Sequence, residues 1–309
     1  MGAHGRRQLR AALSLTMYLV LFAVVLAVLA KYFLMPNSLK AVQSASSSRP
    51  ASASPSDISK TLVLASTTRD DTTWLSQIPS SLNWSIAQYR VDAPLSPALS
   101  VPSTNGNEAM VYLTYIIDHY DTLPDVVFFH HAHFQAWHQK LDAIEQLTRL
   151  RPTYILKAGY ASTRCLPGCE NIVKLAGGEP GEFPKFASLD RKIQLVTLLD
   201  AFLEEEKGEA IPDKIAAPCC AQFAVSREAI QRREREWWVD LRNWVINTPL
   251  KSINSGRLME HLWHLWFGME AELCPPLEAC QCHVFGIGDN CNKHFELEES
   301  MEYNAYHGS

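Results

Sequence analysis

Short apolar runs alternate with longer segments of helical periodicity through most of the chain. Runs rich in β-branched and aromatic residues predict buried strands at Thr61–Ser66, Trp84–Val91, Asp125–Phe129 and Cys219–Val225. Segments in which apolar residues recur every three or four positions predict helices at Glu108–Tyr120, Leu141–Leu150, Leu189–Glu206, Arg227–Val245 and Ser255–Gly268. This alternation is typical of an α/β domain with a mostly parallel sheet and helices on both sides.

Individual residues mark where some of these helices begin and end. Ser226 is expected to cap the helix that follows it, because its hydroxyl can accept a hydrogen bond from a free N–H group of the first turn. Gly268 is a suitable C-cap, since glycine adopts the left-handed conformation that often ends a helix. Pro124 prevents the helix over residues 108–120 from continuing into the next strand.

The N-terminal segment differs from the rest because it is apolar without interruption. No charged residue occurs between Ala11 and Ala30, and apolar residues continue after Lys31 to residue 34. A helix over residues 11–34 is long enough to cross the apolar core of a bilayer, which is about 30 Å thick. A cleaved secretory signal is the alternative, although its apolar core is usually shorter.

Charges beside this segment predict its orientation. Arg6, Arg7 and Arg10 precede it, whereas only Lys31 and Lys40 follow it closely. Positive charge tends to remain in the cytoplasm, so the first ten residues are expected to form a cytoplasmic tail. The sequence therefore predicts a single-pass type II membrane protein of the secretory pathway, in the Golgi or endoplasmic reticulum, with the lipid bilayer as a partner.

Composition divides the rest of the chain into three parts. Residues 35–59 are rich in Ser, Ala and Pro, which predicts a flexible stalk. Residues 60–270 hold the periodic segments and are expected to form one globular α/β domain. Residues 271–309 are expected to form a cysteine-rich extension and tail.

The cysteines indicate an oxidising compartment. All eight follow the apolar segment, and an even number in a lumenal chain predicts disulfides. Cys165 and Cys169 are close enough in sequence to close a small loop, and the group from Cys274 to Cys291 is placed to staple the C-terminal region. Zinc binding is the competing interpretation, although the spacings fit no standard zinc finger.

Two further features bear on modification and partners. Asn83 begins an N-W-S sequon, which is consistent with glycosylation in the secretory pathway. The net charge is a mild −5, and no basic stripe with interleaved aromatic residues occurs. A nucleic-acid partner is therefore not expected.

Histidines gather at the end of the predicted strand Asp125–Phe129. His130, His131 and His133 follow it, and alternate residues of a strand share a face, so His131 and His133 are expected to point away from His130. Ligands of open α/β sheets collect at the carboxyl ends of strands. All three are therefore candidate substrate-binding residues, and His131 and His133 are candidate metal ligands. The alternative is a loop with surface imidazoles.

A second polar cluster lies on the otherwise apolar helix at Ser255–Gly268. Arg257, Glu260, His261 and His264 are spaced by three or four residues, so they form one stripe. A buried charge must be paired or must serve a site. Glu260 and His264 are therefore candidate catalytic residues. A structural carboxylate–imidazole pair and a metal site are the alternatives.

Acidic residues follow the first predicted strand. Asp70 and Asp71 are candidate substrate-binding residues, and a turn or helix cap is the alternative interpretation. Other catalytic patterns are absent from the sequence: it has no G-x-S-x-G, no P-loop, no H-E-x-x-H and no G-x-G-x-x-G after a strand. Ordinary serine hydrolases, NTPases, zincin proteases and Rossmann dehydrogenases are therefore disfavoured.

Several separated motifs occur in order along the body. They read LVLASTTRDDTTWL, EAMVYLTYIIDHYDTLPDVVFF, CCAQFAVSREAI, SGRLMEHLWHLWFG and CHVFG, between Thr61 and Gly286. Together they resemble a family of fungal proteins known only as a domain of unknown function. That family is distantly similar to glycosyltransferases of the type A, nucleotide-sugar-binding fold. The resemblance implies a single domain with a glycosyltransferase-A-like mixed sheet that handles a nucleotide sugar or a glycan.

The resemblance also implies roles for single residues. Type A transferases usually end the strand at Asp125–Phe129 with D-x-D, which holds Mn²⁺ or Mg²⁺, whereas HHAH stands there in this chain. Imidazoles suit a softer divalent metal such as Zn²⁺, so a divalent metal is a possible cofactor. Glu108 or Glu260 is expected to act as the base, with His264 as its orienting partner and Arg257 holding an anionic group.

The sequence thus predicts a membrane-anchored, lumenal, glycosyltransferase-like protein that acts on a nucleotide sugar or a glycan. A non-catalytic, membrane-anchored binding protein that has lost its metal site is an alternative, as the missing D-x-D indicates. An accessory protein of a fungal secondary-metabolite pathway is another, because a fold does not decide among these functions.

Overall fold

The computed structural model describes residues 58–179, 181, 189–204, 207–289 and 291. The expected tail, membrane helix and nearly all of the stalk lie outside these residues, as does the chain after residue 291. No helix in the described ranges combines the length and apolar character needed to cross a membrane. The body already includes Ile58, which is buried, and Ser59, whose N–H and hydroxyl both donate to Asp125 Oδ2 at 2.8 Å.

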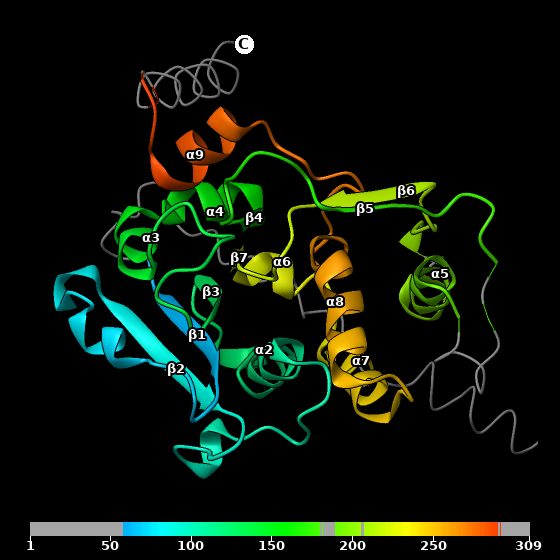
Figure 1. The fold of residues 1–309 in the computed structure, drawn as a ribbon, viewed down its shortest axis with the longest axis horizontal. Helices are drawn as coiled ribbons and strands as arrows, with labels where there is room; N and C mark the ends of the chain where they lie inside the picture. Colours follow the sequence, from blue (N-terminus) through cyan, green and yellow to red (C-terminus); the bar gives the residue numbers. More distant parts are fainter. Residues whose placement is uncertain (1–57, 180, 182–188, 205–206, 290, 292–309) are drawn as a thin grey trace, which may run out of the picture. The chain divides into compact units, whose positions relative to one another are not determined.

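A mixed sheet of five strands forms the centre of the body (Figure 1). The strands lie in the order β2 (Trp84–Arg90), β1 (Lys60–Ser66), β3 (Val126–His131), β7 (Phe223–Ser226) and β4 (Tyr160–Ser162). Strand β1 runs parallel to β2 and β3, whereas β7 is antiparallel to β3 and β4. The carboxyl ends of β2, β1 and β3 therefore meet at one edge.

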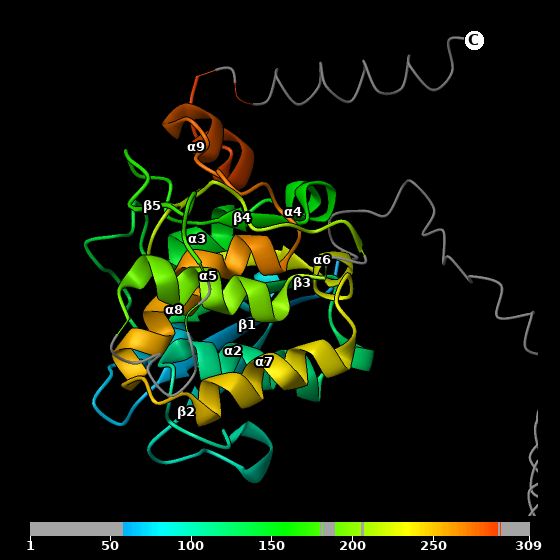
Figure 2. The same ribbon diagram turned by 90° about the vertical axis from the view of Figure 1, so that its right-hand side faces the viewer.

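Helices cover both faces of this sheet (Figures 1 and 2). One face carries α2 (Glu108–Asp118), α5 (Arg191–Phe202), α7 (Arg235–Asn247) and α8 (Ser252–Trp266). The other face carries α3 (Ala143–Arg149), α4 (Pro152–Ala158) and α9 (Leu277–Phe285). The sequence prediction of an α/β domain with helices on both sides is confirmed.

The remaining elements are short. They are the antiparallel pair β5 (Asn171–Lys174) and β6 (Lys214–Ala217), the helix α6 (Arg227–Ile230), and the 3-10 helices η3 (Thr73–Gln77), η4 (Ser80–Leu82), η5 (Pro97–Leu99) and η6 (Tyr120–Thr122).

Alternate residues of each central strand supply two separate cores. In β3, Val127 and Phe129 pack with α2, α7 and α8, whereas Val126 and Phe128 pack with α3, α4 and α9. Both faces are therefore buried, which explains why the strands read as continuous apolar runs.

Two predicted elements have different bounds in the structure. The strand expected at Cys219–Val225 begins only at Phe223, because Cys220 and Ala221 have φ of 84° and 43°, which a strand cannot contain. The helix expected over Arg227–Val245 is interrupted between α6 and α7. Its cap is confirmed, since Ser226 Oγ accepts a hydrogen bond from Ala229 N–H at 3.1 Å.

All eight cysteines form disulfides, but the expected small loop between Cys165 and Cys169 is wrong. The pairs are Cys165–Cys280, Cys169–Cys274, Cys219–Cys220 and Cys282–Cys291. Cys165 and Cys169 instead tie the centre of the chain to the segment around α9. Val284 and Phe285 of α9 are buried in the core beneath α3 and α4, so this segment packs into the body and is not an appended extension.

Candidate functional site

A cavity of about 400 Å³ opens at the carboxyl edge of the parallel strands. Strand β1 contributes its last two residues and the segment after it, β2 and β3 contribute their carboxyl ends, and the start of α2 completes the lining. The lining residues are Ala65, Ser66, Thr67, Asp70, Val91, Thr104, Asn107, Glu108, His131, Ala132 and His133. This is the edge at which open α/β sheets bind ligands. The structure therefore gathers four of the residues expected from the sequence: Asp70, Glu108, His131 and His133.

Glu108 is the titratable group with the clearest chemical potential in this cavity. It is the first residue of α2, where the helix dipole and its own N–H group favour the charged carboxylate. Burial opposes these effects and prevails, and the nearby charge of Glu260 acts in the same direction as burial, so the pKa of Glu108 rises to about 7. A carboxyl group with such a pKa can take up and release a proton at neutral pH.

An unusual turn holds Glu108 in place. Gly106 and Asn107 precede it with φ of 80° and 51°, and a positive φ is strained for asparagine with its ψ of −132°. Asn107 N–H donates to Ser252 Oγ at 3.1 Å, and Ser252 Oγ donates to Asn107 Oδ1 at 2.9 Å. On α8, Gly256 faces this turn so closely that an added Cβ would lie 3.0 Å from Gly106 O. Helix α8 therefore positions the first turn of α2.

The substitution Gly256→Ala is expected to destabilise the protein. The added methyl group meets backbone atoms of a turn that is already strained, and overpacking of this kind typically costs about 1–3 kcal/mol. Alanine regains up to about 1 kcal/mol through its helix propensity, so a net loss of about 1 kcal/mol is expected. Urea denaturation measures the difference, and a variant as stable as the wild type would show that the turn yields freely.

His131 and His133 line the cavity from the end of β3. Their ring centroids are 6.2 Å apart, and His131 also lies 5.5 Å from the ring of His138. The buried Nε2 of His131 has no hydrogen-bond partner among the described residues. Burial, reinforced by the neighbouring histidines, lowers the pKa of His131 well below its usual value. His131 therefore offers a neutral imidazole with an unused polar atom.

His130 points to the other face of the sheet, as the alternation of β3 predicts. Its ring lies 6.0 Å from Trp74 and 5.1 Å from Phe128, and its Nδ1 contacts His131 O at 2.6 Å. Burial lowers its pKa to about 4. His130 is a core residue that does not line the cavity.

The two aspartates after β1 serve different purposes. Asp70 lines the cavity, and its Oδ2 accepts hydrogen bonds from Thr67 N–H at 2.6 Å and from Thr67 Oγ1 at 2.8 Å. Asp71 is exposed and accepts from the N–H and hydroxyl of Thr73 at the start of η3. Asp71 is thus a local cap, which was the alternative interpretation of its position.

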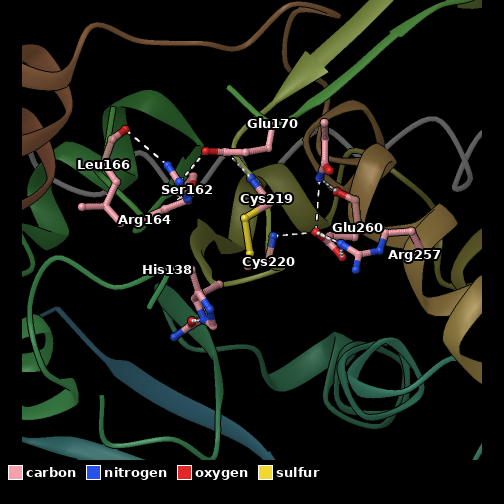
Figure 3. The surroundings of a disulfide bond; sticks show 11 residues. His138, Ser162, Arg164, Leu166, Glu170, Cys219, Cys220, Arg257 and Glu260 are labelled. Atoms are coloured by element: carbon pink, nitrogen blue, oxygen red, sulfur yellow. Dashed lines mark hydrogen bonds and ion pairs between the residues drawn. A yellow bond between two sulfur atoms is a disulfide. The ribbon is translucent and has the colours of Figure 1, made fainter. Parts of the chain in front are cut away.

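Within the polar stripe of α8, Glu260 bonds to several neighbours, among them Arg257 and Cys220 (Figure 3). Its side chain is 8% exposed and pairs with Arg257 at 3.0 Å. Its Oε1 also accepts from Cys220 N–H at 2.8 Å and from Asn171 Nδ2 at 3.4 Å. The charges of Glu260 and Arg257 both reach Glu108, so this stripe acts on the site electrostatically.

The histidines of this stripe bond to the backbone. His264 Nε2 contacts Ala271 O at 3.1 Å, and His261 Nδ1 contacts Arg257 O at 2.7 Å. The expected pair of Glu260 with His264 is therefore not formed, because His264 turns towards the loop that follows α8. Burial lowers the pKa of His264 to about 4.

The sequence did not single out several polar residues that the fold brings to this region. Ser66, Thr67, Thr104 and Asn107 line the cavity through chain segments that meet only in the folded body. His138 is buried, and its Nε2 contacts Gln222 Oε1 at 2.5 Å. In the sequence, the glycine and asparagine at positions 106 and 107, directly before a predicted helix, were a local sign of the irregular turn found there.

A metal site needs several possible ligand atoms close together. Across the described ranges, the group in which three such atoms lie within 4.8 Å of one another is Cys219, Cys220 and Glu260. His131 and His133 belong to no such group, so their arrangement does not form a ready metal site.

The exposed Asn83 stands apart from the cavity. It lies between η4 and β2 in a left-handed conformation with φ of 52°. Its glycosylation stays a prediction, and its exposure is compatible with it.

Comparison with known proteins gives a result at the level of the family. No curated protein and no solved structure matches the chain. The profile of a family described as "Protein of unknown function (DUF3431)" matches residues 62–283. This range begins within β1 and includes the other strands of the central sheet and every residue that lines the cavity. The chain belongs to this family of proteins of unknown function.

Proposed function

We propose that the body is a glycosyltransferase-like, sugar-handling enzyme that binds a glycan in the cavity and uses Glu108 as its acid–base residue. The observation that carries this proposal is a carboxyl group with a pKa of about 7 in the wall of a polar cavity of about 400 Å³. This volume lies in the usual range for small-molecule sites. Perturbed carboxyl groups in cavities are typical of catalytic sites.

The charges around the cavity favour a neutral ligand. Among the described residues that line it, Asp70 and Glu108 are acidic and none is Lys or Arg. Arg257 lies nearby, but it is paired with Glu260. A diphosphate would meet this negative charge, which the N-terminus of α2 offsets only in part. The hydroxyl groups of a sugar can instead donate to carboxylates and imidazoles, so a glycan fits better than a nucleotide sugar.

The proposed chemistry uses groups already in the wall of the cavity. The carboxylate of Glu108 accepts the proton of an acceptor hydroxyl as that oxygen attacks the anomeric carbon of a donor sugar, which requires hydrogen-bond reach between carboxylate and hydroxyl. The glycosidic bond of the donor breaks in the same reaction, and Glu108 returns the proton to the leaving oxygen. His131 remains neutral and binds another hydroxyl through its unused Nε2. Glu260 acts as a positioning residue, because its charge helps to keep the pKa of Glu108 near neutrality.

The cellular setting is part of the proposal. Four disulfides that use all eight cysteines are expected of a chain that folds in an oxidising lumen. The uncharged segment within residues 11–34 would then anchor the body as a type II membrane protein.

A non-catalytic glycan-binding protein is the second candidate. Two observations favour it. The D-x-D motif is absent at the end of β3. In the part of the chain that the structure describes, His131 and His133 also belong to no cluster of three possible metal ligands. In that case the same cavity binds a sugar, and Glu108 contributes only a hydrogen bond.

Calorimetric titration of the full-length chain with neutral oligosaccharides and with nucleotide sugars tests the proposal. A neutral oligosaccharide is expected to bind, and His131→Ala is expected to weaken it about tenfold because a hydrogen bond in a buried site is lost. His119→Ala is the matched control, since His119 follows the far end of α2, and it should leave binding unchanged. Binding of nucleotide sugars alone, or of neither class, would contradict the proposal.

A further inference from the structure

The disulfide between Cys219 and Cys220 joins neighbouring residues beside the polar stripe of α8 (Figure 3). Cys219 N–H donates to Glu170 Oε2 at 3.3 Å, and Cys220 N–H donates to Glu260 Oε1 at 2.8 Å. Both Sγ atoms and a carboxylate oxygen of Glu260 lie within 4.8 Å of one another. Two sulfur atoms and a carboxylate are thus held together at one point in the body.

Stabilisation of the fold does not account for this disulfide. A cross-link stabilises a protein mainly by restricting the unfolded chain, and the effect grows with the length of the loop that it closes. Cys165–Cys280 and Cys169–Cys274 have sequence separations of 115 and 105, whereas Cys219 and Cys220 are separated by 1. A bond between neighbours closes no long loop of the unfolded chain and so contributes little by this mechanism, which makes a chemical role the better explanation.

We propose that Cys219, Cys220 and Glu260 form a redox-controlled binding site for a soft divalent cation such as Zn²⁺ or Cd²⁺. The oxidised pair cannot ligate the ion, because its sulfur atoms are bonded to each other. The reduced pair supplies two thiolates, and Glu260 supplies a carboxylate oxygen. Glu260 also acts on Glu108 electrostatically, but the three residues of this site do not line the cavity, and the inference requires no sugar to bind there.

The chemical step is an ordinary thiol–disulfide exchange. A dithiol reductant attacks one sulfur, forms a mixed disulfide, and leaves as a cyclic disulfide, so two electrons and two protons pass to Cys219 and Cys220. The cation then binds both sulfur atoms, and the two thiol protons are released to water. Exchange with a small-molecule disulfide, which is itself reduced to two thiols, restores the Cys219–Cys220 bond and expels the ion.

The geometry suits such an ion. Two thiolates on one Zn²⁺, each at about 2.3 Å, stand a little under 4 Å apart in a tetrahedral site, which is about the spacing that adjacent side chains reach after the bond opens. Arg257 at 3.0 Å and Asn171 Nδ2 at 3.4 Å hold the Glu260 carboxylate in place. Such outer contacts orient a ligand and raise affinity. Thiolates select soft cations over Mg²⁺ or Ca²⁺.

The pair is accessible and strained in its oxidised form. Cys220 is half-buried, whereas Cys219 is 4% exposed, so a reductant is expected to approach from the side of Cys220. Cys220 and Ala221 both have positive φ, 84° and 43°, which is unfavourable for residues other than glycine. Opening the bond frees this backbone, and exposed or strained disulfides are the ones that exchange readily.

Cadmium binding by the purified full-length chain tests the proposal. The protein is titrated with Cd²⁺ before and after mild reduction by a dithiol, and the ultraviolet thiolate-to-cadmium absorption is followed. One Cd²⁺ per chain is expected after reduction and none before it. The double variant Cys219→Ser, Cys220→Ser should lose this uptake. Glu260→Gln, which can still accept from Cys220 N–H, should weaken it at least about tenfold.

The variant Cys282→Ser, Cys291→Ser is the matched control. It removes another disulfide that closes a short loop, with a sequence separation of 9, and neither cysteine belongs to the cluster of Cys219, Cys220 and Glu260. It should keep the uptake of Cd²⁺. Uptake that survives in the Cys219→Ser, Cys220→Ser variant, or that is equally tight in Glu260→Gln, would overturn the proposal. Absence of uptake by the reduced wild type would do the same.

Discussion

Replacement of Glu108 by glutamine is expected to stabilise the fold above pH 7 and at the same time to slow turnover of the proposed glycan substrate. The carboxyl group has a pKa of about 7 in the folded protein, against an ordinary value of 4.5. This difference corresponds to about 3 kcal/mol between the two protonation states. Glutamine keeps the shape of the protonated side chain and cannot ionise, so it avoids that cost.

The pH dependence of this effect has a definite sign. Between pH 4.5 and about 7 the folded state holds a proton on Glu108 that the unfolded state has lost. Stability therefore falls as the pH rises through this window, and the loss is complete above pH 7. Glu108→Gln should match the wild type at pH 4 and exceed it by up to about 3 kcal/mol at pH 8, as measured by urea denaturation.

The rate of turnover is expected to fall in the Glu108→Gln variant, although its stability rises. A positioned general base typically contributes about 10²–10⁴-fold to the rate, so Glu108→Gln should lose a factor of that order in kcat. In the wild type, kcat/KM should rise as the pH increases through about 7, where the carboxylate forms in the free protein. A group that lowers stability and is needed for activity has the signature of a catalytic residue.

Glu145→Gln is the matched control for this substitution. Glu145 also lies in the first turn of a helix, α3, but it is exposed, and it forms a weak ion pair with Arg149 at 3.9 Å. Its replacement should change stability by less than about 0.5 kcal/mol. If Glu108→Gln were no more stable than the wild type at pH 8, Glu108 would have an ordinary carboxyl group and the proposed chemistry would lose its basis.

Periodicity was sufficient for the elements that are buried along their whole length. The strands β1 and β3 and the helix α2 lie close to their predicted bounds, because each is apolar and buried over most of its length. Periodicity could not predict that β7 runs antiparallel to β3, since parallel and antiparallel strands of a fully buried sheet have the same composition. Strands β4, β5 and β6 have only three or four residues each, too few for a periodic signal.

The candidate site was predictable where it follows directly from a strand end. His131 and His133 leave β3 on the side of the cavity because side chains alternate along a strand. The partners of Glu260 were not predictable, because Cys220 and Asn171 reach it from distant parts of the sequence. Spacing along α8 favoured a contact between Glu260 and His264. It could not show that His264 would bond to the backbone carbonyl of Ala271 instead.

Disulfide connectivity was likewise outside what spacing can give. Cys165 and Cys169 are near in sequence, yet each faces the segment around α9, and the core packing of Val284 and Phe285 determines that arrangement. The two resulting cross-links are nested, which has a measurable consequence for stability.

The two nested disulfides are expected to stabilise the body in a strongly non-additive way. Cys165–Cys280 and Cys169–Cys274 span 115 and 105 residues, separations that differ by ten. While either bond remains, the other closes a ring of only roughly ten to fifteen residues, which is worth about 3 kcal/mol. Once one is gone, the survivor closes a loop of about a hundred residues and is worth about 4.7 kcal/mol.

Each single removal, Cys165→Ala with Cys280→Ala or Cys169→Ala with Cys274→Ala, should therefore cost about 3 kcal/mol, and removal of both about 7–8 kcal/mol. This exceeds the sum of the single effects, and it approaches the whole stability of many domains, so the quadruple variant should be largely unfolded at 37 °C. Urea denaturation without reductant measures the single variants. Cys219→Ala with Cys220→Ala is the control, and it should cost far less than either nested bond, because it opens no loop. If the two single removals cost about 4.7 kcal/mol each and simply added, the segment around α9 would not be held at both points in the native chain.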